Sequence, residues 1–248
     1  MIMIPMAGLS SRFTTAGYKL PKYMLEVHGK TLFEWSLISF AKYFDSELFI
    51  IVILKNVANK QFASQKAKDL GILNYKIIAV DPTEGQAHSV YLGLMGVACE
   101  LLAQPITIFN IDTIRLGYTL PALPQSTQGY LEVFRGEGSN WSYVKPEFDG
   151  STKVVEVAEK NPISDLACTG IYYFAQATDF IQAYEYGLNT PLNDIAHKER
   201  YVAPLYNYLI SNGKDIRYNI VDKSQIIFCG VPDEYEAFKS KPFSGIIA

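Results

Sequence analysis

The chain has 248 residues, of which 49% are hydrophobic and 19% charged, and its formal net charge is −3 at pH 7. This length is enough for one large α/β domain or two small ones, and the composition is that of an ordinary soluble globular protein. A weakly acidic chain offers no broad surface for a polynucleotide, so no nucleic-acid partner is predicted, although a local basic pocket could still bind a nucleotide.

The cysteines and the apolar runs predict a cytoplasmic protein without a membrane anchor. Cys99, Cys168 and Cys229 lie far apart and include no C-x-x-C pair, so neither a disulfide framework nor a zinc site is predicted. The longest continuous apolar run, 48–54, is too short to cross a bilayer, and no basic region precedes the first apolar run.

Strand and helix patterns alternate over the first 112 residues. Short apolar runs predict strands at 2–6, 48–54, 75–80 and 106–111, and the segments between them predict helices at 32–40, 59–70 and 86–102. Thr31 and Glu34 have the spacing of a capping box at the start of the first helix. The alternation predicts an α/β sheet wound with right-handed crossovers.

The pattern changes after a loop-like stretch at 112–128. Residues rich in aromatic and β-branched types predict strands at 130–135, 141–145, 153–158 and 169–174, followed by helices at 177–186 and 203–211, strands at 216–221 and 225–228, and a short helix after Pro232. We therefore predict a Rossmann-like α/β fold, with a mixed, mostly parallel sheet flanked by helices and a smaller β-rich extension. No linker or repeat interrupts it, so we predict a single domain, 1–248.

The loop after the first predicted strand suits a polyphosphate. Gly8 and the small residues that follow it let the backbone turn sharply and aim its N–H groups at an anion. Arg12 adds a forked cation, and Lys22 adds a point charge. Two cations alone are more often solvated surface residues, but a glycine-containing loop after a buried strand favours nucleotide binding.

Two other positions allow both a functional and a plain structural interpretation. Asp112 directly follows a buried strand, where it suits a divalent cation shared with phosphates and equally a turn or helix cap. Gln86 follows Gly85, where its amide could recognise a nucleobase edge or simply open an ordinary helix.

These segments resemble the motifs of the sugar-phosphate nucleotidylyltransferases, or NDP-sugar pyrophosphorylases. Residues 7–13 and 21–24 resemble A-G-x-G-S/T-R-F/L and P-K-P-L/M, with Ser10 where the family usually has Gly and Tyr23 where it usually has Pro. Residues 85–90 resemble G-T/L-A-x-S/A-I/V, and 154–160 with 169–174 resemble V-x-E-x-x-E-K and G-I/L-Y-x-F.

The resemblance implies an enzyme that joins a nucleoside triphosphate and a sugar 1-phosphate, or a similar small phosphomonoester, and releases pyrophosphate. It implies Mg²⁺ as cofactor, a nucleotide-binding half at 1–128 and an acceptor-binding half at 129–248, and it leaves a homo-oligomer open. The residues implied are Arg12 and Lys22 for catalysis, Asp112 for the metal, Ala7, Gly8, Leu9, Ser10, Ser11, Gly85 and Gln86 for the nucleotide, and Tyr143, Glu159, Lys160 and Gly170 for the acceptor.

The closing segment departs from the family. Residues 229–235 resemble D-x-G-T-P-E-D-Y/L, and we expect Cys229 in place of the leading Asp, which in many members is the second Mg²⁺ ligand. Because a neutral thiol is a poor Mg²⁺ ligand, another acid such as Asp194 or Asp222 replaces it, the metal relies on Asp112 and the phosphates, or catalysis is weakened.

Two other functions stay open. A glycosyltransferase of the same sheet type normally has an Asp-x-Asp pair after the central strand, whereas Asn110 occupies the first of these positions here. A protein that binds nucleotide but has lost its metal would show no turnover.

Overall fold

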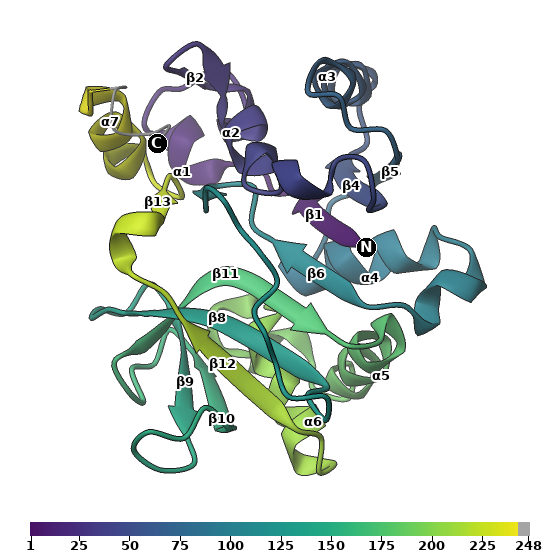
Figure 1. Cartoon of the computed structure of the whole chain (residues 1–248). Coiled ribbons are helices and arrows are strands. Elements are labelled where there is room, and N and C mark those ends of the chain that lie inside the picture. Colours follow the sequence, from purple (N-terminus) through teal and green to yellow (C-terminus); the bar gives the residue numbers. More distant parts are fainter. Residues whose placement is uncertain (243–248) are drawn as a thin grey trace.

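The computed structural model describes residues 1–242, and they form a central mixed sheet with helices on both faces (Figure 1). The strands are β1 (Ile2–Met6), β2 (Glu26–Val27), β3 (Lys30–Thr31), β4 (Phe49–Leu54), β5 (Tyr75–Val80), β6 (Ile106–Phe109), β7 (Thr113–Ile114), β8 (Gly129–Arg135), β9 (Ser142–Pro146), β10 (Val154–Glu159), β11 (Leu166–Phe174), β12 (Ile216–Ile220) and β13 (Ile227–Phe228). The α-helices are α1 (Ser11–Thr15), α2 (Leu32–Ile38), α3 (Val57–Asp69), α4 (Gln86–Met95), α5 (Ala177–Gly187), α6 (Tyr206–Ser211) and α7 (Pro232–Ser240). Short 3-10 helices are η1 (Lys22–Met24), η2 (Ala41–Tyr43), η3 (Cys99–Ala103), η4 (Leu192–Asp194), η5 (Ala196–Lys198), η6 (Ala203–Leu205) and η7 (Lys223–Gln225).

Within residues 1–242, nine strands make up the main sheet. Its order is β5-β4-β1-β6-β11-β9-β10, and β8 lies on the other edge of β11 with β12 beyond it. The strands β5, β4, β1 and β6 are parallel, whereas β11 runs antiparallel to β6, β8 and β9. The predicted fold class is confirmed, and the division of the chain at residue 128 stays a prediction.

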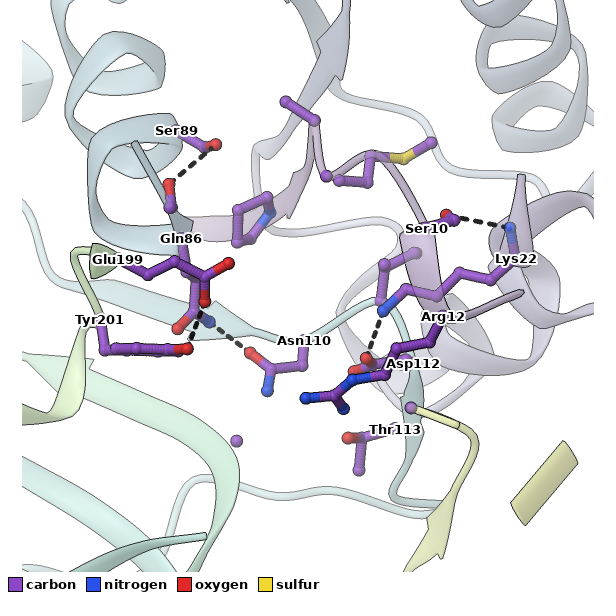
Figure 2. Close-up of a pocket in the computed structure, with 18 of the residues that line it drawn as sticks. Ser10, Arg12, Lys22, Gln86, Ser89, Asn110, Asp112, Thr113, Glu199 and Tyr201 are labelled. Carbon is purple, nitrogen blue, oxygen red and sulfur yellow. Dashed lines mark hydrogen bonds and ion pairs between the residues drawn. The ribbon is translucent and has the colours of Figure 1, made fainter. Parts of the chain in front are cut away.

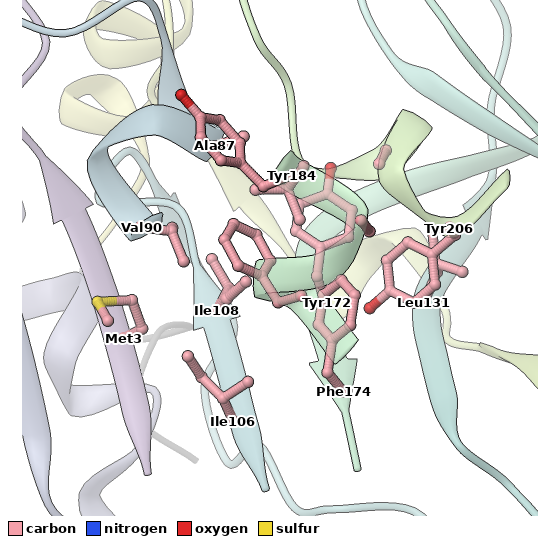
Figure 3. Close-up of a cluster of buried hydrophobic side chains, with 14 of the residues drawn as sticks. Met3, Ala87, Val90, Ile106, Ile108, Leu131, Tyr172, Phe174, Tyr184 and Tyr206 are labelled. Atoms are coloured by element: carbon pink, nitrogen blue, oxygen red, sulfur yellow. The ribbon is translucent and has the colours of Figure 1, made fainter. Parts of the chain in front are cut away.

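The central strands β1 and β4 are apolar along their whole length because both faces of the sheet are covered there, whereas the edge strand β5 contains the exposed Lys76. All five residues of β1 are buried. Met3 packs against α4 and belongs to the buried cluster that also includes residues of α5 and α6, whereas Ile2 and Ile4 belong to the cluster with α2 and α3 on the other face. Figure 3 shows part of the first of these clusters, with Met3 on β1, Val90 on α4, Ile108 on β6 and Phe174 on β11.

β11 joins the two parts of the sheet. Its second half, 171–174, pairs with β6, and Ala167 near its start pairs with β9 along the same edge. Between these two stretches, the register with β8 shifts between Cys168 and Tyr172. On the edge that faces β6 and β9, the pairing with β6 stops at Ile171 and the pairing with β9 is at Ala167, so Gly170 lies between them, directly beyond the carboxyl end of β6.

The predicted helices and strands agree with the observed ones except at a few of their ends and at two short elements. The capping box at α2 is present: Thr31 Oγ1 accepts from Glu34 N at 3.3 Å, and Thr31 N donates to the Glu34 carboxylate at 2.9 Å. The predicted helix 86–102 ends at Met95, because Gly96 terminates it before η3 begins. α1 was not predicted, and β7 lies in the predicted loop, where it pairs with β13. In residues 1–242, no helix has the length and apolar character needed to span a membrane.

Candidate active site

A cavity of about 750 Å³ lies at the carboxyl ends of β1 and β6. Ligands of open α/β sheets bind at this edge, because loops that leave parallel strands converge there. Of the predicted site residues, those that line the cavity are Ala7, Gly8, Leu9, Ser10, Ser11, Arg12, Lys22, Gly85, Gln86, Asp112, Glu159, Lys160 and Gly170. The structure thus brings together both sequence halves around one space.

The loop after β1 is held by Ser10 and Phe13. Ser10 has φ 53°, the left-handed conformation that favours glycine, which accounts for the glycine usual at this position of the resembling motif. The Ser10 hydroxyl accepts from the backbone N–H of Lys22 at 3.2 Å, so the loop and η1 are joined. Phe13 is buried at 1% exposure and anchors α1, while Arg12 on the same helix lines the cavity (Figure 2).

Lys22 and Asp112 form an ion pair in the lining of the cavity. The Lys22 Nζ lies 2.5 Å from Asp112 Oδ2, and each side chain is 21% exposed (Figure 2). The backbone of Asp112 is also fixed, because its carbonyl oxygen accepts a hydrogen bond from the backbone N–H of Cys229 at 2.8 Å. A cation and a carboxylate therefore lie side by side where a phosphate group could reach both.

Gln86, Asn110 and Gly170 form the middle of the cavity. Gln86 Nε2 donates to Asn110 Oδ1, so the start of α4 is joined to the end of β6 (Figure 2). Asn110 in turn packs against Gly170, where a Cβ atom would lie 2.7 Å from Asn110 Nδ2. Gly170 also has φ +99°, so this strand position requires glycine for two separate reasons.

We expect Gly170→Ala to destabilise the protein more than Gly150→Ala does. Both glycines have positive φ, +99° and +88°, and an alanine at either costs about 1–3 kcal/mol of backbone strain. A Cβ at Gly150 meets nothing within 4 Å, whereas one at Gly170 must displace Asn110, at about 1–3 kcal/mol more. Urea denaturation of the two variants measures the difference, and equal losses would contradict the close approach.

The far end of the cavity contains Glu159 and Lys160, which are adjacent in the chain. On a regular strand they would face opposite ways, but Lys160 leaves strand geometry with φ 53°, and both side chains line the cavity. The Glu159 carboxylate accepts from the Ser142 hydroxyl, and burial raises the pKa of Glu159. Lys160 Nζ donates to the Tyr201 hydroxyl at 2.5 Å, and that hydroxyl donates to Glu199.

Tyr143 does not line the cavity. Its ring is fully buried against Phe134 and Ala167, and its hydroxyl donates to the carbonyl of Gly138 at 2.5 Å. Successive residues of a strand point to opposite faces, so its neighbour Ser142 faces the cavity instead.

Cys229 is also turned away from the cavity, which corrects the expected match to the closing motif. Its side chain is fully buried in an apolar cluster with Phe13 and Trp35, and burial raises the pKa of the thiol. Phe228 and Gly230 on either side of it line the cavity. Counted back from Gly230, the leading Asp of D-x-G corresponds to Phe228, so the predicted register was wrong by one residue.

Glu234 is an acid of the cavity that the sequence analysis missed. One of its carboxylate oxygens accepts from the backbone N–H groups of Gly230 and Val231, at 2.8 and 3.3 Å. A Cβ on Gly230 would lie 3.3 Å from Asp112 Oδ2 and 3.5 Å from Glu234 Oε2, so the two carboxylates face the same small residue. Burial, with a smaller contribution from the charge of Asp112, raises the pKa of Glu234. Its place in the quoted closing motif was the available signal, whereas Asp194 and Asp222 do not line the cavity.

The acidic side chains suit a magnesium ion that phosphates also bind. Among residues 1–242, no three His, Cys, Asp or Glu side chains are close enough to hold a metal ion by themselves. Mg²⁺ is usually held by one or two carboxylates and by substrate phosphates, and Asp112 with Glu234 supplies such oxygen ligands.

Comparison with known proteins finds solved structures that resemble this chain. No protein-family model and no curated sequence matches the chain. A crystal structure of the nucleoside-diphosphate-sugar pyrophosphorylase from Vibrio cholerae RC9 is 48% identical, covers 97% of this chain and 100% of its own, and superposes with a TM-score of 0.92. The inositol-1-phosphate CTP transferase from T. maritima covers 96% of this chain and 93% of its own, at 13% identity and TM-score 0.73. A UDP-glucose pyrophosphorylase complexed with UDP-glucose covers 96% of both chains, at 16% identity and TM-score 0.72. The last two likenesses show a shared fold.

Proposed function

The chain belongs to the sugar-phosphate nucleotidylyltransferases, the nucleoside-diphosphate-sugar pyrophosphorylases, and from this premise we propose that it joins a nucleoside triphosphate to a sugar 1-phosphate. The products are an NDP-sugar and pyrophosphate. The observation that carries the proposal is the convergence of Arg12, Lys22, Asp112 and Lys160, from four separate segments, on one cavity. A glycosyltransferase is not supported, because the family membership agrees with pyrophosphate chemistry.

In the proposed reaction, a phosphate oxygen of the acceptor attacks the α-phosphorus of the triphosphate in line. The new P–O bond forms as the bond from the α-phosphorus to the β-bridging oxygen breaks, and pyrophosphate leaves with that electron pair. Because the acceptor phosphate is already an anion at neutral pH, no general base is required. The protein's task is to position two anions and to neutralise the charge that develops between them.

Each cation of the cavity has a separate task in this proposal. Arg12, on the loop after β1, binds the departing pyrophosphate through its planar fork of N–H donors. Lys22 neutralises charge on the reacting phosphates. Lys160, at the far end, binds the acceptor phosphate, and Glu159 beside it accepts from sugar hydroxyls. Gln86, which is joined to Asn110, faces the nucleobase.

Magnesium is part of the proposal. When bound, Mg²⁺ supplies positive charge to the phosphates and lowers the repulsion between acceptor and triphosphate. Asp112 would hold it, and Glu234 is the nearby carboxylate that could assist in place of the acid missing at Phe228. A cytoplasmic location and a place in NDP-sugar and polysaccharide biosynthesis are also proposed, and the free thiols of Cys99, Cys168 and Cys229 support a reducing compartment.

The proposal is tested by pyrophosphate release from the purified protein. The four common nucleoside triphosphates are crossed against a panel of sugar 1-phosphates and small phosphomonoesters such as phosphocholine. We expect turnover for one pair in the presence of Mg²⁺ and its loss when EDTA removes the metal. Nucleotide binding by thermal shift without turnover for any pair or metal would contradict the proposal and indicate a binding protein.

A further inference from the structure

Arg200 is a buried cation that does not touch the cavity. It is 9% exposed and is absent from the cavity lining, although Glu199 and Tyr201 on either side of it line the cavity. Glu199 has extended backbone, φ −136° and ψ 141°, so successive side chains here point in opposite directions. The guanidinium therefore points away from the substrates while its two neighbours face them.

The Arg200 side chain joins three segments. Its Nε donates to Glu84 Oε2 at 2.9 Å, one terminal nitrogen donates to the carbonyl of Gly187 at 2.9 Å, and the other donates to the carbonyl of Thr190 at 3.1 Å. Gly187 is the last residue of α5, where a cation is also favoured by the helix dipole. The planar guanidinium can donate hydrogen bonds in three directions at once. A lysine ammonium on its flexible stem cannot reproduce this geometry.

The Arg200 backbone holds the turn before α4 from the other side. Its N–H donates to the carbonyl of Glu84 at 2.7 Å, and its carbonyl accepts from Ala87 N at 2.8 Å. Gly85 lies between these two bonds, with φ +127°, and a Cβ there would be 2.7 Å from Arg200 N. The glycine is thus required by the close approach of residue 200, and the turn that leads to Gln86 is attached to it.

Tyr201 connects Arg200 to the acceptor end of the cavity, because it follows Arg200 in the chain and contacts Lys160. Lys160 Nζ donates to the Tyr201 hydroxyl at 2.5 Å and lies 4.4 Å from the centre of the Tyr201 ring. Burial, then the hydrogen bond to Glu199, raises the pKa of Tyr201, so the phenol stays neutral and keeps its proton for Glu199. The Lys160 ammonium is therefore held by a ring and a hydroxyl whose place depends on the residue before them.

From these contacts we propose that Arg200 is a positioning residue that sets the acceptor subsite, acting through Tyr201 on Lys160, and that also holds the Gly85 turn. The proposal rests on the proposed function for the identity of the acceptor phosphate. It joins the two substrate subsites through one residue that touches neither substrate.

The test compares Arg200→Lys and Tyr201→Phe with the control Arg217→Lys. Arg217 lies on β12 and pairs with Asp215, with Nε and Oδ1 2.6 Å apart, and it does not line the cavity. For the substrate pair found by pyrophosphate release, we expect Arg200→Lys and Tyr201→Phe to raise the acceptor KM about tenfold, with kcat within about threefold, because binding shared by ground and transition states is lost. The triphosphate KM should rise only in Arg200→Lys. The control should change neither value.

Hydrogen exchange provides a measurement that needs no turnover. In Arg200→Lys, peptides covering 83–90 and 158–161 should exchange faster than in the wild-type protein, while Arg217→Lys leaves both unchanged. Unchanged exchange at these peptides, or an unchanged or lowered acceptor KM in Tyr201→Phe, would overturn the proposal. A wild-type protein silent across the substrate panel would instead overturn the proposed function, and exchange alone would then decide the role of Arg200.

Discussion

Lys22→Ala is expected to lower kcat by about two to three orders of magnitude while the protein stays folded. The Lys22 ammonium forms an ion pair with Asp112, at the end of the cavity where the triphosphate is proposed to react. A cation that contacts charge developing in the transition state cannot be replaced by water without a large loss of rate. The measurement is pyrophosphate release at saturating concentrations of both substrates and Mg²⁺.

Stability should change little in this variant, because Lys22 and Asp112 are both 21% exposed and the remaining carboxylate is reached by water. We expect a loss of about 1 kcal/mol or less in urea denaturation. Lys19→Ala is the matched control, since Lys19 is exposed on the same connection and does not line the cavity. Wild-type turnover in Lys22→Ala would remove Lys22 from the proposed mechanism.

The sequence predicts well those parts of the fold in which neighbouring residues decide the structure. β1 is predicted with its observed ends because Ile2 to Met6 is an apolar run bounded by a glycine-containing loop. The capping box depends on Thr31 and Glu34, three positions apart, and it is present. The motif residues after β1 and β6 come together because parallel strands end at one edge of the sheet.

Contacts between distant segments were beyond sequence reasoning. Nothing in the pattern around Arg200 shows that it docks on Gly85, since the two positions are more than 100 residues apart and neither lies in a periodic segment. The error at Cys229 has a different cause: D-x-G has one residue between its Asp and its Gly, so the motif aligned on Gly230 already points to Phe228. β13 has only two residues, too few for alternation to reveal the misalignment. The helix beginning at Gln86 was predicted too long because Gly96 ends it, although apolar residues continue beyond.

The buried ion pair between Arg115 and Glu132 should have the largest effect on stability. The Arg115 and Glu132 side chains are 9% and 1% exposed, their Nε and Oε1 atoms are 3.0 Å apart, and the same carboxylate oxygen accepts from Thr169 Oγ1 at 3.2 Å. Arg115 follows β7 in the connection that begins at Asp112, and Thr169 precedes Gly170. The pair thus ties together two segments that line the cavity.

We expect Arg115→Met to destabilise the protein by about 3–5 kcal/mol at pH 7.5, because it leaves Glu132 buried without its cation. Arg135→Met is the matched control: Arg135 pairs with Asp165 at the surface, with side chains 70% and 54% exposed, and should cost about 1 kcal/mol or less. Urea denaturation of both variants measures the difference.

The deficit of Arg115→Met should shrink as the pH falls. Burial raises the pKa of Glu132 above the ordinary value of 4.5, and Arg115 is the main opposing influence, so its removal raises the pKa further. A carboxyl group whose pKa is higher in the folded than in the unfolded state binds its proton more readily when folded. The penalty is therefore full above the folded-state pKa and disappears toward 4.5. Arg115→Met combined with Glu132→Gln, which carries no charge at any pH, should recover most of the stability at pH 7.5. A deficit that is independent of pH, or not recovered in the double variant, would mean that lost packing rather than the unpaired carboxylate is responsible.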